Sequence, residues 1–306
     1  MTSIVIAYHN EGQPFVEECV RQASSTWGMG EPPEIIVVDD FSDIPLTLSP
    51  LFLTLGVKLL RNEEKKGVGK VFDLGIAEAQ GENVIMLGCD MRFENNGWAK
   101  TLLEDLKQHP KALICTKCIT LRRNQLSMEE GRKLPSGYGC DLLPIYENDI
   151  LRARWAMRQN KPIYRVPVIM GACYAFRKDW YTYIEGWDMY EDKGALEAFI
   201  SIKNWFLGGE CLVDTTVETG HIYRDHDEHG RKMHNEIYNK LLIDHWFLED
   251  RFFGKLPDSP SKREAERMFG ENRESIEEKK EKYRRMSKIT TEEYLNKYLN
   301  VTTIHP

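Results

Sequence analysis

The stretch Glu34-Ile-Ile-Val-Val-Asp-Asp-Phe-Ser-Asp43 decides the fold that the sequence predicts. Its four consecutive apolar residues are typical of a strand that is buried on both faces, as in a parallel sheet. Asp39 and Asp40 follow where this strand ends, and ligands of open α/β sheets bind at the carboxyl ends of the strands. The two carboxylates therefore either contact a ligand or cap the turn that follows.

A second apolar run also ends in an acid. It reads Val84-Ile-Met-Leu-Gly-Cys-Asp90, and its last residue stands where the predicted strand ends. Because the carboxyl ends of parallel strands meet at one edge of a sheet, both sets of acids are expected there. Two buried strands that deliver acids to one edge indicate a site for a nucleotide together with a divalent cation.

Strands and helices alternate along the first half of the chain. Strands are expected at 3–8, 35–38, 57–60, 84–87 and 113–118, and helices at 14–26, 67–79 and 98–106. This alternation indicates βαβ units, and therefore an α/β fold with a Rossmann-like, mostly parallel sheet flanked by helices. A further strand is expected over 166–176, with Gly171 at a point where a backbone or a ligand approaches closely.

The middle of the chain and its last part differ from this pattern. Residues 122–165 are polar and weakly periodic, so we expect a long excursion over the sheet face, where acceptor-binding elements are usually found. Helices are expected at 194–207 and 234–253. Two capping boxes, Ser275 with Glu278 and Thr290 with Glu293, predict two more helices near the end.

The composition favours a soluble globular protein. Hydrophobic residues make up 42% and charged residues 29% of the chain, and no segment approaches the ~20 apolar residues that cross a bilayer. We therefore expect a cytoplasmic protein without membrane contact. Its seven cysteines, an odd number without a repeating pattern, indicate reduced thiols rather than a disulfide framework.

The charge is distributed unevenly. The net charge of −7 argues against a general nucleic-acid binder, yet residues 261–288 contain ten Lys/Arg and seven Asp/Glu, a local balance of +3. This basic surplus lies on a predicted helix. It is either a solvated helix face or a docking surface for a polyanionic acceptor such as a nucleic acid.

The sequence resembles GT-A fold glycosyltransferases, in particular the polypeptide N-acetylgalactosaminyltransferases and related family 2-like enzymes. The blocks that carry the resemblance keep their order along the chain and are Ser3-Ile-Val-Ile-Ala-Tyr-His-Asn-Glu11, Glu34 to Asp43, Arg61 to Gly67, Leu87 to Trp98, Met170-Gly-Ala, Gly186-Trp-Asp188, Leu196-Glu197 and Gly220-His-Ile-Tyr-Arg224. The resemblance implies a metal-dependent enzyme that moves a sugar from a UDP-sugar to an acceptor hydroxyl. Residues 1–253 would then form the catalytic domain, with a nucleotide-binding half (1–120) and an acceptor and metal half (121–253), and 254–306 a helical extension.

The resemblance also implies the metal ligands. The family carries an Asp-x-Asp or Asp-x-His motif at the end of the strand equivalent to 84–87, and here only the second acid, Asp90, is present. Asp90 and His221 would bind Mn²⁺ or Mg²⁺, with diphosphate and water as the other ligands. Arg224 would clamp the diphosphate. The segment 225–234 would close over the donor, and its three histidines are either solvated or a zinc site.

Residues on the nucleotide side follow from the same blocks. They are Ala7, Tyr8, His9, Glu11, Asp39, Asp40, Gly67, Lys70 and Gly171. Ala7 and Tyr8 would meet the uracil, Glu11 would lie near the diphosphate, and one of the two aspartates would accept a hydrogen bond from the base or the ribose. His9-Asn-Glu11 is also consistent with a plain helix N-terminus whose acid is favoured by the helix dipole.

The catalytic candidates are Glu191 and Asp192. Inverting enzymes of this fold need a carboxylate base, often in a Glu-Asp pair that begins a helix, but here extra residues precede the helix at Gly194-Ala-Leu-Glu197. Retaining relatives need no such base, and the rest of the chain resembles them. We therefore expect retention, with an inverting family 2-like enzyme as the alternative.

Two questions stay open at this point. The missing acid at Gly88 also fits a sugar-nucleotide-binding protein without catalysis. The acceptor is a protein, a glycan precursor or a hydroxymethylated base of phage DNA, and the basic stretch 261–288 gives the last of these some support.

Overall fold

A computed structural model describes residues 1–123, 127–223 and 232–298 of the chain. The strands are β1 (Thr2–Tyr8), β2 (Glu34–Asp39), β3 (Lys58–Arg61), β4 (Asn83–Gly88), β5 (Met91–Arg92), β6 (Ala112–Arg122), β7 (Cys140–Tyr146), β8 (Asp149–Trp155), β9 (Ile163–Arg165), β10 (Cys173–Arg177) and β11 (Glu210–Tyr223). The helices are α1 (Gln13–Ser25), α2 (Pro50–Thr54), α3 (Val68–Glu78), α4 (Trp98–Gln108), α5 (Met128–Gly131), α6 (Lys178–Tyr183), α7 (Leu196–Phe206), α8 (Met233–Phe247), α9 (Pro260–Glu271), α10 (Arg273–Met286) and α11 (Thr291–Tyr298), with a 3₁₀ turn η1 (Phe253–Lys255).

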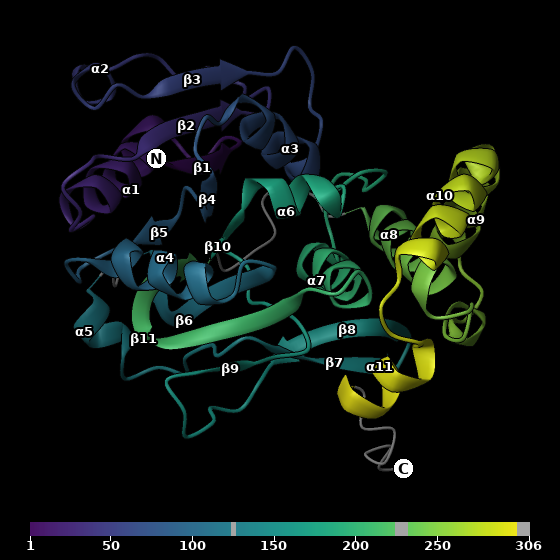
Figure 1. The fold of residues 1–306 in the computed structure, drawn as a ribbon. Coiled ribbons are helices and arrows are strands. Elements are labelled where there is room, and N and C mark those ends of the chain that lie inside the picture. Colours follow the sequence, from purple (N-terminus) through teal and green to yellow (C-terminus); the bar gives the residue numbers. More distant parts are fainter. Residues whose placement is uncertain (124–126, 224–231, 299–306) are drawn as a thin grey trace.

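One large sheet runs through the molecule in the order β3-β2-β1-β4-β10-β6-β11-β5, and β9 pairs with β11 (Figure 1). The strand pairs β3–β2, β2–β1, β1–β4 and β6–β11 are parallel, as the alternation of strands and helices predicts. Strand β10 is antiparallel to both of its neighbours, and β5 and β9 run antiparallel to β11. The α/β class is confirmed, and the sheet is more mixed than expected.

Both faces of the sheet are covered. Residues of α1, α2 and α4 form one hydrophobic cluster with the sheet, and residues of α3, α6, α7 and α8 form another on the opposite face. Figure 1 shows these two groups of helices on either side of the strands. The buried strands β2 and β4, with Ile35 to Val38 and Val84 to Leu87 at most 2% exposed, account for the continuous apolar runs in the sequence.

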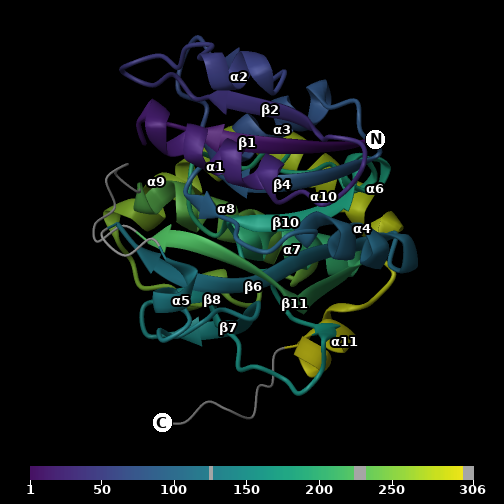
Figure 2. The ribbon, with the colours of Figure 1, turned by 90° about the vertical axis from the view of Figure 1, so that its left-hand side faces the viewer.

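The expected excursion at 122–165 contains a regular element. Strands β7 and β8 pair in an antiparallel hairpin that lies beside β6 and β11 (Figure 2). The sequence hides it because Leu151 has a positive φ of 49°, which interrupts the alternation of inward and outward side chains. The strand expected over 166–176 is shorter than predicted: only Cys173–Arg177 joins the sheet, while Val168 forms an isolated bridge with Cys140.

Two helix predictions near the end of the chain are wrong in detail. The helix expected over 234–253 ends at Phe247, because Oδ2 of Asp244 accepts hydrogen bonds from the amides of Phe252 (3.0 Å) and Phe253 (2.7 Å) and stabilises a turn instead. The basic stretch 261–288 is two helices, α9 and α10, rather than one, and Ser275 lies inside α10 instead of capping it.

The second capping box is confirmed. The hydroxyl of Thr290 accepts from the amide of Glu293 at 3.2 Å, and the Glu293 carboxylate accepts from the amide of Thr290 at 2.7 Å, at the start of α11. The seven cysteines are free and buried, as expected for reduced thiols. Among the described helices none combines the length and the apolar composition that a membrane span requires.

A cluster of charges fastens α10 to the body of the protein. Glu185, in the turn after α6, accepts hydrogen bonds from Lys279 (2.9 Å), Lys282 (2.5 Å) and the hydroxyl of Tyr283 (2.8 Å). Burial raises the pKa of Glu185, but these three donors outweigh burial and lower the pKa to about 2. The carboxylate is therefore held in its charged form over the whole ordinary pH range.

Candidate functional site

A cleft of about 1390 Å³ opens at the carboxyl ends of β1, β4 and β11. Its walls are the ends of these strands, the segment from Asp192 to Ala198, the β7–β8 hairpin and parts of α8. The location matches the expectation from the strand-end acids, because parallel strands bring their carboxyl ends to one edge of the sheet.

Asp90 and His221 meet in this cleft. Oδ1 of Asp90 lies 3.4 Å from Nε2 of His221, and the two side chains are 13% and 20% exposed. The backbone holds them together, because β5 pairs with β11 so that His221 stands opposite Met91. In addition, the amide of Ile222 donates to the carbonyl of Asp90 at 3.1 Å. A carboxylate and an imidazole are thereby fixed side by side.

The pair can hold a divalent cation. Oδ1 of Asp90 and Nε2 of His221, 3.4 Å apart, are close enough to contact one cation, and carboxylate oxygen and imidazole nitrogen are both ligands of divalent metals. The described part of the chain contains no cluster of three or more His, Cys, Asp or Glu side chains around a common point, so further ligands would come from the substrate or from water.

Gly88 stands at the place of the first acid of the two-acid motif and lies against the carboxylate of Asp90. A Cβ at Gly88 would lie 2.5 Å from Oδ1 of Asp90. The carboxylate of Asp90 thus occupies the space that a side chain at position 88 would need. In this conformation the strand end accommodates one acid, and that acid faces His221.

The two aspartates after β2 have different positions. Asp40 lines the cleft, and its carboxylate accepts from the amides of Lys66 (2.8 Å) and Gly67 (2.9 Å) and from the side chain of Asn62 (2.8 Å). Asp39 does not line the cleft: it is 1% exposed and accepts from the amide of Ser42 at 2.9 Å and from Arg61. Asp39 shapes the turn after β2, and Asp40 positions the loop that borders the cleft.

The segment after β1 contributes four of the predicted residues. Ala7, Tyr8, His9 and Glu11 all line the cleft. Nδ1 of His9 lies 2.7 Å from the carbonyl of Asp40, and the amide of His9 donates to Glu11 at 2.6 Å. The hydroxyl of Tyr8 accepts from the amide of Gly12, and burial raises the pKa of Tyr8. These contacts order the loop before α1 next to the end of β2.

Gly67 and Asp192 connect the two halves of the cleft. They form a parallel bridge, in which the amide of Val68 donates to the carbonyl of Asp192 at 3.0 Å. Gly67 has a φ of 85°, and a Cβ there would overlap the backbone of Asp192. Asp192 itself has a φ of 45°, and Ala195 beyond it has a φ of 58°. Strained backbone of this kind is concentrated at functional sites, which agrees with the place of this segment in the cleft.

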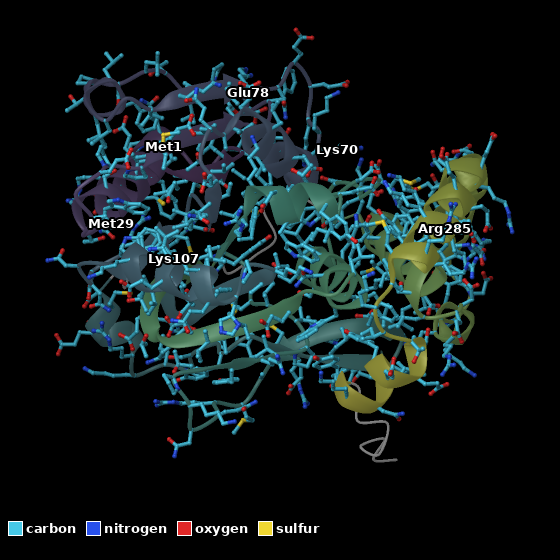
Figure 3. All side chains as sticks on the ribbon, viewed as in Figure 1. Met1, Met29, Lys70, Glu78, Lys107 and Arg285 are labelled. Atoms are coloured by element: carbon cyan, nitrogen blue, oxygen red, sulfur yellow. The ribbon has the colours of Figure 1, made fainter. Side chains whose placement is uncertain are left out.

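The acidic pair is divided between the cleft and the surface. Asp192 lines the cleft, with Nδ2 of Asn235 at 3.4 Å and Nζ of Lys65 at 4.0 Å from its carboxylate. Glu191 does not line it and forms an ion pair with Lys70 at 2.8 Å. Lys70, near the start of α3 (Figure 3), is likewise not among the residues that line the cleft. Arg224 and most of the segment 225–234 lie outside the described residues.

Gly171 and Glu197 meet in the middle of the cleft. A Cβ at Gly171 would overlap the carboxylate of Glu197, so the absence of a side chain at Gly171 makes room for this acid in the first turn of α7. Sequence reasoning assigned no role to Glu197, although Leu196-Glu197 is one of the blocks that carry the resemblance. The presence of Glu197 in that block was the one signal in the sequence that could have identified it.

The hairpin residues were also missed. Tyr146, Arg152 and Trp155 line the cleft opposite the strand ends. Lys240 of α8 anchors the hairpin through Asp149 (2.5 Å) and also pairs with Glu236 (2.7 Å). The hydrophobic periodicity of this part of the sequence is too weak to predict the two strands. No sequence pattern therefore predicted that these side chains line the cleft.

Comparisons with known proteins agree with this geometry. The family profile described as Glycosyl transferase family 2 matches residues 3–184. Human polypeptide N-acetylgalactosaminyltransferase 14 is 29% identical over 227 residues, which are 73% of this chain and 41% of that protein. Polypeptide N-acetylgalactosaminyltransferase 11 of Xenopus tropicalis is 23% identical over 288 residues, 90% of this chain and 47% of that protein. The chain thus spans less than half the length of these relatives.

Solved structures show the same fold. The structure of GalNAc-T7 with UDP, GalNAc and Mn²⁺ is similar over 82% of this chain and 49% of that chain, with a TM-score of 0.62 and 18% identity. The structure of S. aureus TarS 1–349 in complex with UDP-GlcNAc is similar over 80% of this chain and 65% of that chain, with a TM-score of 0.53 and 15% identity. At these identities the similarity shows a shared GT-A architecture.

Proposed function

This chain belongs to glycosyl transferase family 2 and is a glycosyltransferase, and on that premise we propose that it moves a sugar from a UDP-sugar to an acceptor hydroxyl with a divalent cation held by Asp90 and His221. One observation carries the proposal: the carboxylate and the imidazole face each other at 3.4 Å inside the main cleft. Because the described residues contain no group of three or more His, Cys, Asp or Glu side chains that could hold a metal ion, the proposal rests on this pair.

The donor is proposed to be a UDP-hexose such as UDP-GalNAc or UDP-GlcNAc. Support comes from two proteins of the same fold, since GalNAc-T7 was solved with UDP and GalNAc and TarS with UDP-GlcNAc. In this chain Ala7, Tyr8 and Asp40 border the cleft on the side of β1 and β2, where the nucleotide would bind.

The chemistry requires stabilisation of the leaving group. As the bond from the sugar to the diphosphate breaks, negative charge develops on the diphosphate, and a bound divalent cation supplies the positive charge that stabilises it. Asp90 and His221 would hold this cation. The acceptor oxygen forms the new bond to the anomeric carbon, UDP leaves with the electron pair of the broken bond, and the acceptor proton passes to the departing diphosphate.

We propose that the reaction retains the anomeric configuration. The carboxylate of Asp192 already has Asn235 at 3.4 Å and Lys65 at 4.0 Å, and Glu191 lies outside the cleft in an ion pair with Lys70. This arrangement supports a role in shaping the acceptor side of the cleft. In a retaining reaction no protein carboxylate has to remove the acceptor proton, because the leaving diphosphate can take it.

A donor screen tests the proposal. The full chain is incubated with Mn²⁺ and one UDP-sugar at a time, and UDP release is followed with and without EDTA. We expect release that depends on Mn²⁺ and falls more than about tenfold in His221→Gln, because a ligand of the metal is lost. The matched control is His109→Gln, whose imidazole contacts Glu210 at 2.7 Å outside the cleft. Absence of release from every UDP-sugar, or release that EDTA does not affect, would contradict the proposal.

A further inference from the structure

From Ile150 on, strand β8 and the segment after it form a basic stretch without acids in an acidic protein. Residues 150–165 contain five basic residues and no acidic one, in a chain of net charge −7. The basic residues are Arg152, Arg154, Arg158, Lys161 and Arg165. Because the rest of the chain is more negative still, this stretch attracts anions to one side of the molecule.

Three of these arginines are available to a ligand. Within the described residues Arg152, Arg154 and Arg158 have no carboxylate within 4 Å, although Asp141 is the cross-strand neighbour of Arg154. Arg165 differs, since it pairs with Glu210 at 2.9 Å. Arg152 and Arg154 project from the same face of β8, about 6.7 Å apart along the strand. Two exposed guanidinium groups thus lie along β8, and Arg158 follows three residues after the end of the strand.

Aromatic rings lie between these cations. The guanidinium of Arg152 stands 4.8 Å above the ring of Tyr146, and that of Arg158 lies 5.9 Å from the ring of Tyr138. Trp155, between Arg154 and Arg158 in the chain, is 37% exposed, and Tyr146 is 41% exposed. Trp155 points to the other face of β8 from Arg152 and Arg154. Exposed rings close to arginines can stack on planar groups while the arginines contact anions.

A chain of ring contacts joins this surface to the proposed metal site. The ring of Trp155 lies 5.8 Å from that of Tyr223, and the ring of Tyr223 lies 4.2 Å from that of His221. Trp155, Tyr223 and His221 all line the same cleft. A polymer bound along β8 would therefore pass directly in front of the residues proposed to hold the cation.

We infer that the β7–β8 hairpin binds a single-stranded nucleic acid and presents it to the cleft as the acceptor polymer. Arg152, Arg154 and Arg158 contact successive phosphates, and Trp155 and Tyr146 stack on bases. The inference rests on the proposed function, because the acceptor hydroxyl has to reach the donor beside Asp90 and His221. An extended peptide could pair with the free edge of β8, but it would leave three guanidinium groups without anionic partners.

The basic stretch 261–288 has weaker grounds for the same role. Its cations are largely neutralised by neighbouring acids: Lys279 pairs with Asp188 at 2.6 Å, Arg284 with Glu281 at 2.8 Å, and Arg267 with Glu264 at 2.7 Å. Arg285, on the same helix as Arg284, projects from α10 well away from the hairpin (Figures 1 and 3). Helix α10 therefore provides control positions for the hairpin.

Binding is measured by fluorescence anisotropy with a fluorescein-labelled 20-nucleotide single-stranded DNA of mixed sequence, across a series of salt concentrations and without donor. Each phosphate contact that is lost lowers the slope of log K against log salt by about 0.7, so Arg152→Gln/Arg154→Gln/Arg158→Gln should lower it by about 2. The control Arg267→Gln/Arg284→Gln/Arg285→Gln removes the same charge and should leave the slope unchanged. Equal effects of the two triple variants, or no binding by the wild type at low salt, would overturn the inference.

The rings are tested separately. Trp155→Ala should weaken binding roughly 5- to 150-fold, the range that corresponds to loss of one stacked base, and Trp155→Phe should restore most of it. Circular dichroism melting of both variants monitors the fold. Polyglutamate is added as a competitor. If Trp155→Ala binds the oligonucleotide as tightly as the wild type does, the inference is overturned. If polyglutamate at the same concentration of charges displaces the oligonucleotide, the inference is also overturned, because the hairpin then binds polyanions in general, acidic peptides included.

The measurements distinguish a failure of the transferase proposal from a failure of the acceptor inference. UDP release without an acceptor reports the donor side and should be unchanged in Arg154→Gln/Arg158→Gln, because neither of these two side chains lines the cleft. If UDP release is present and the oligonucleotide does not bind, the acceptor inference fails and the transferase proposal stands. If the oligonucleotide binds and no UDP-sugar is cleaved, the transferase proposal fails, and the hairpin is a nucleic-acid-binding surface without the acceptor role inferred for it.

Discussion

Nε2 of His221 and Oδ1 of Asp90 stand 3.4 Å apart because the two-residue strand β5 pairs with the end of β11. The acid comes two residues after the end of β4, and the imidazole comes from a strand three places further along the sheet order. The short strand after Asp90 therefore assembles the pair, and a change in either side chain is expected to act on the metal rather than on the core.

Asp90→Asn should weaken Mn²⁺-dependent binding of UDP by more than about 100-fold, since the variant keeps the shape of the side chain and loses its charge. Calorimetric titration of UDP in the presence of Mn²⁺ measures the effect. Asp179→Asn, at an exposed ion pair with Arg177, is the control and should bind normally. Undiminished affinity in Asp90→Asn would remove the metal assignment.

Asp192→Asn should lower turnover by less than roughly 100-fold, which is below the usual effect of losing a general base. The physical reason is that a retaining reaction passes the acceptor proton to the diphosphate. NMR of the product tests this through the anomeric configuration. A β-linked product from an α-linked UDP donor, together with an inactive Asp192→Asn, would make Asp192 the base of an inverting enzyme.

Gly67→Ala should destabilise the protein by more than about 1–3 kcal/mol, which is the cost of a left-handed backbone alone, because the new Cβ also overlaps the backbone of Asp192. Urea unfolding measures the change. Gly270→Ala is the matched control: nothing lies within 4 Å of its Cβ position inside α9, so alanine should stabilise by about 0.5–1 kcal/mol. Equal free energies of unfolding for the two variants would show that the bridge between Gly67 and Asp192 is not tight.

Glu185 should make the free energy of unfolding depend on pH in the acidic range. Its folded pKa of about 2 lies below the usual value of 4.5, so its contribution is complete above pH 4.5 and is lost as the pH falls towards 2. The contribution is at most about 3 kcal/mol. Urea unfolding of the wild type and Glu185→Gln should differ constantly at pH 5–7 and converge below pH 4.5.

The matched control for this pH dependence is Glu281→Gln, at an exposed carboxylate on α10, the helix that carries Lys279, Lys282 and Tyr283. Its ion pairs with Arg284 and Arg285 are on the surface and should contribute little. If the free energies of unfolding of the wild type and Glu185→Gln differ by the same amount down to pH 3, the carboxylate is not held by Lys279, Lys282 and Tyr283 as described.

The strands of the nucleotide half could be predicted because each is buried on both faces. Ile35 to Val38 and Val84 to Leu87 read as continuous apolar runs, and the acids that follow them marked the edge of the sheet where the cleft lies. The sequence alone could not show which of these acids has which role. Asp39 and Asp40 are adjacent, and only the three-dimensional course of the loop decides that one lies in the cleft and the other beneath it.

The acceptor side was less predictable. Few elements pack against the β7–β8 hairpin, so its side chains do not alternate regularly between buried and exposed positions. The left-handed backbone at Leu151 interrupts this alternation further. Ser275 resembled a helix cap because a glutamate follows three residues later, yet α10 has already begun at Arg273, directly after the end of α9. Local patterns of this kind do not show which of two neighbouring polar residues begins a helix.

The space shared by Gly88 and Asp90 couples two positions of the motif. Oδ1 of Asp90 lies 2.5 Å from the place of a Cβ at position 88, and this oxygen is the end of a rotatable side chain. A side chain at position 88 therefore fits the strand end once Asp90 rotates. Such a rotation also changes the direction of the carboxylate that faces His221, so a substitution at position 88 acts on the candidate metal pair through Asp90.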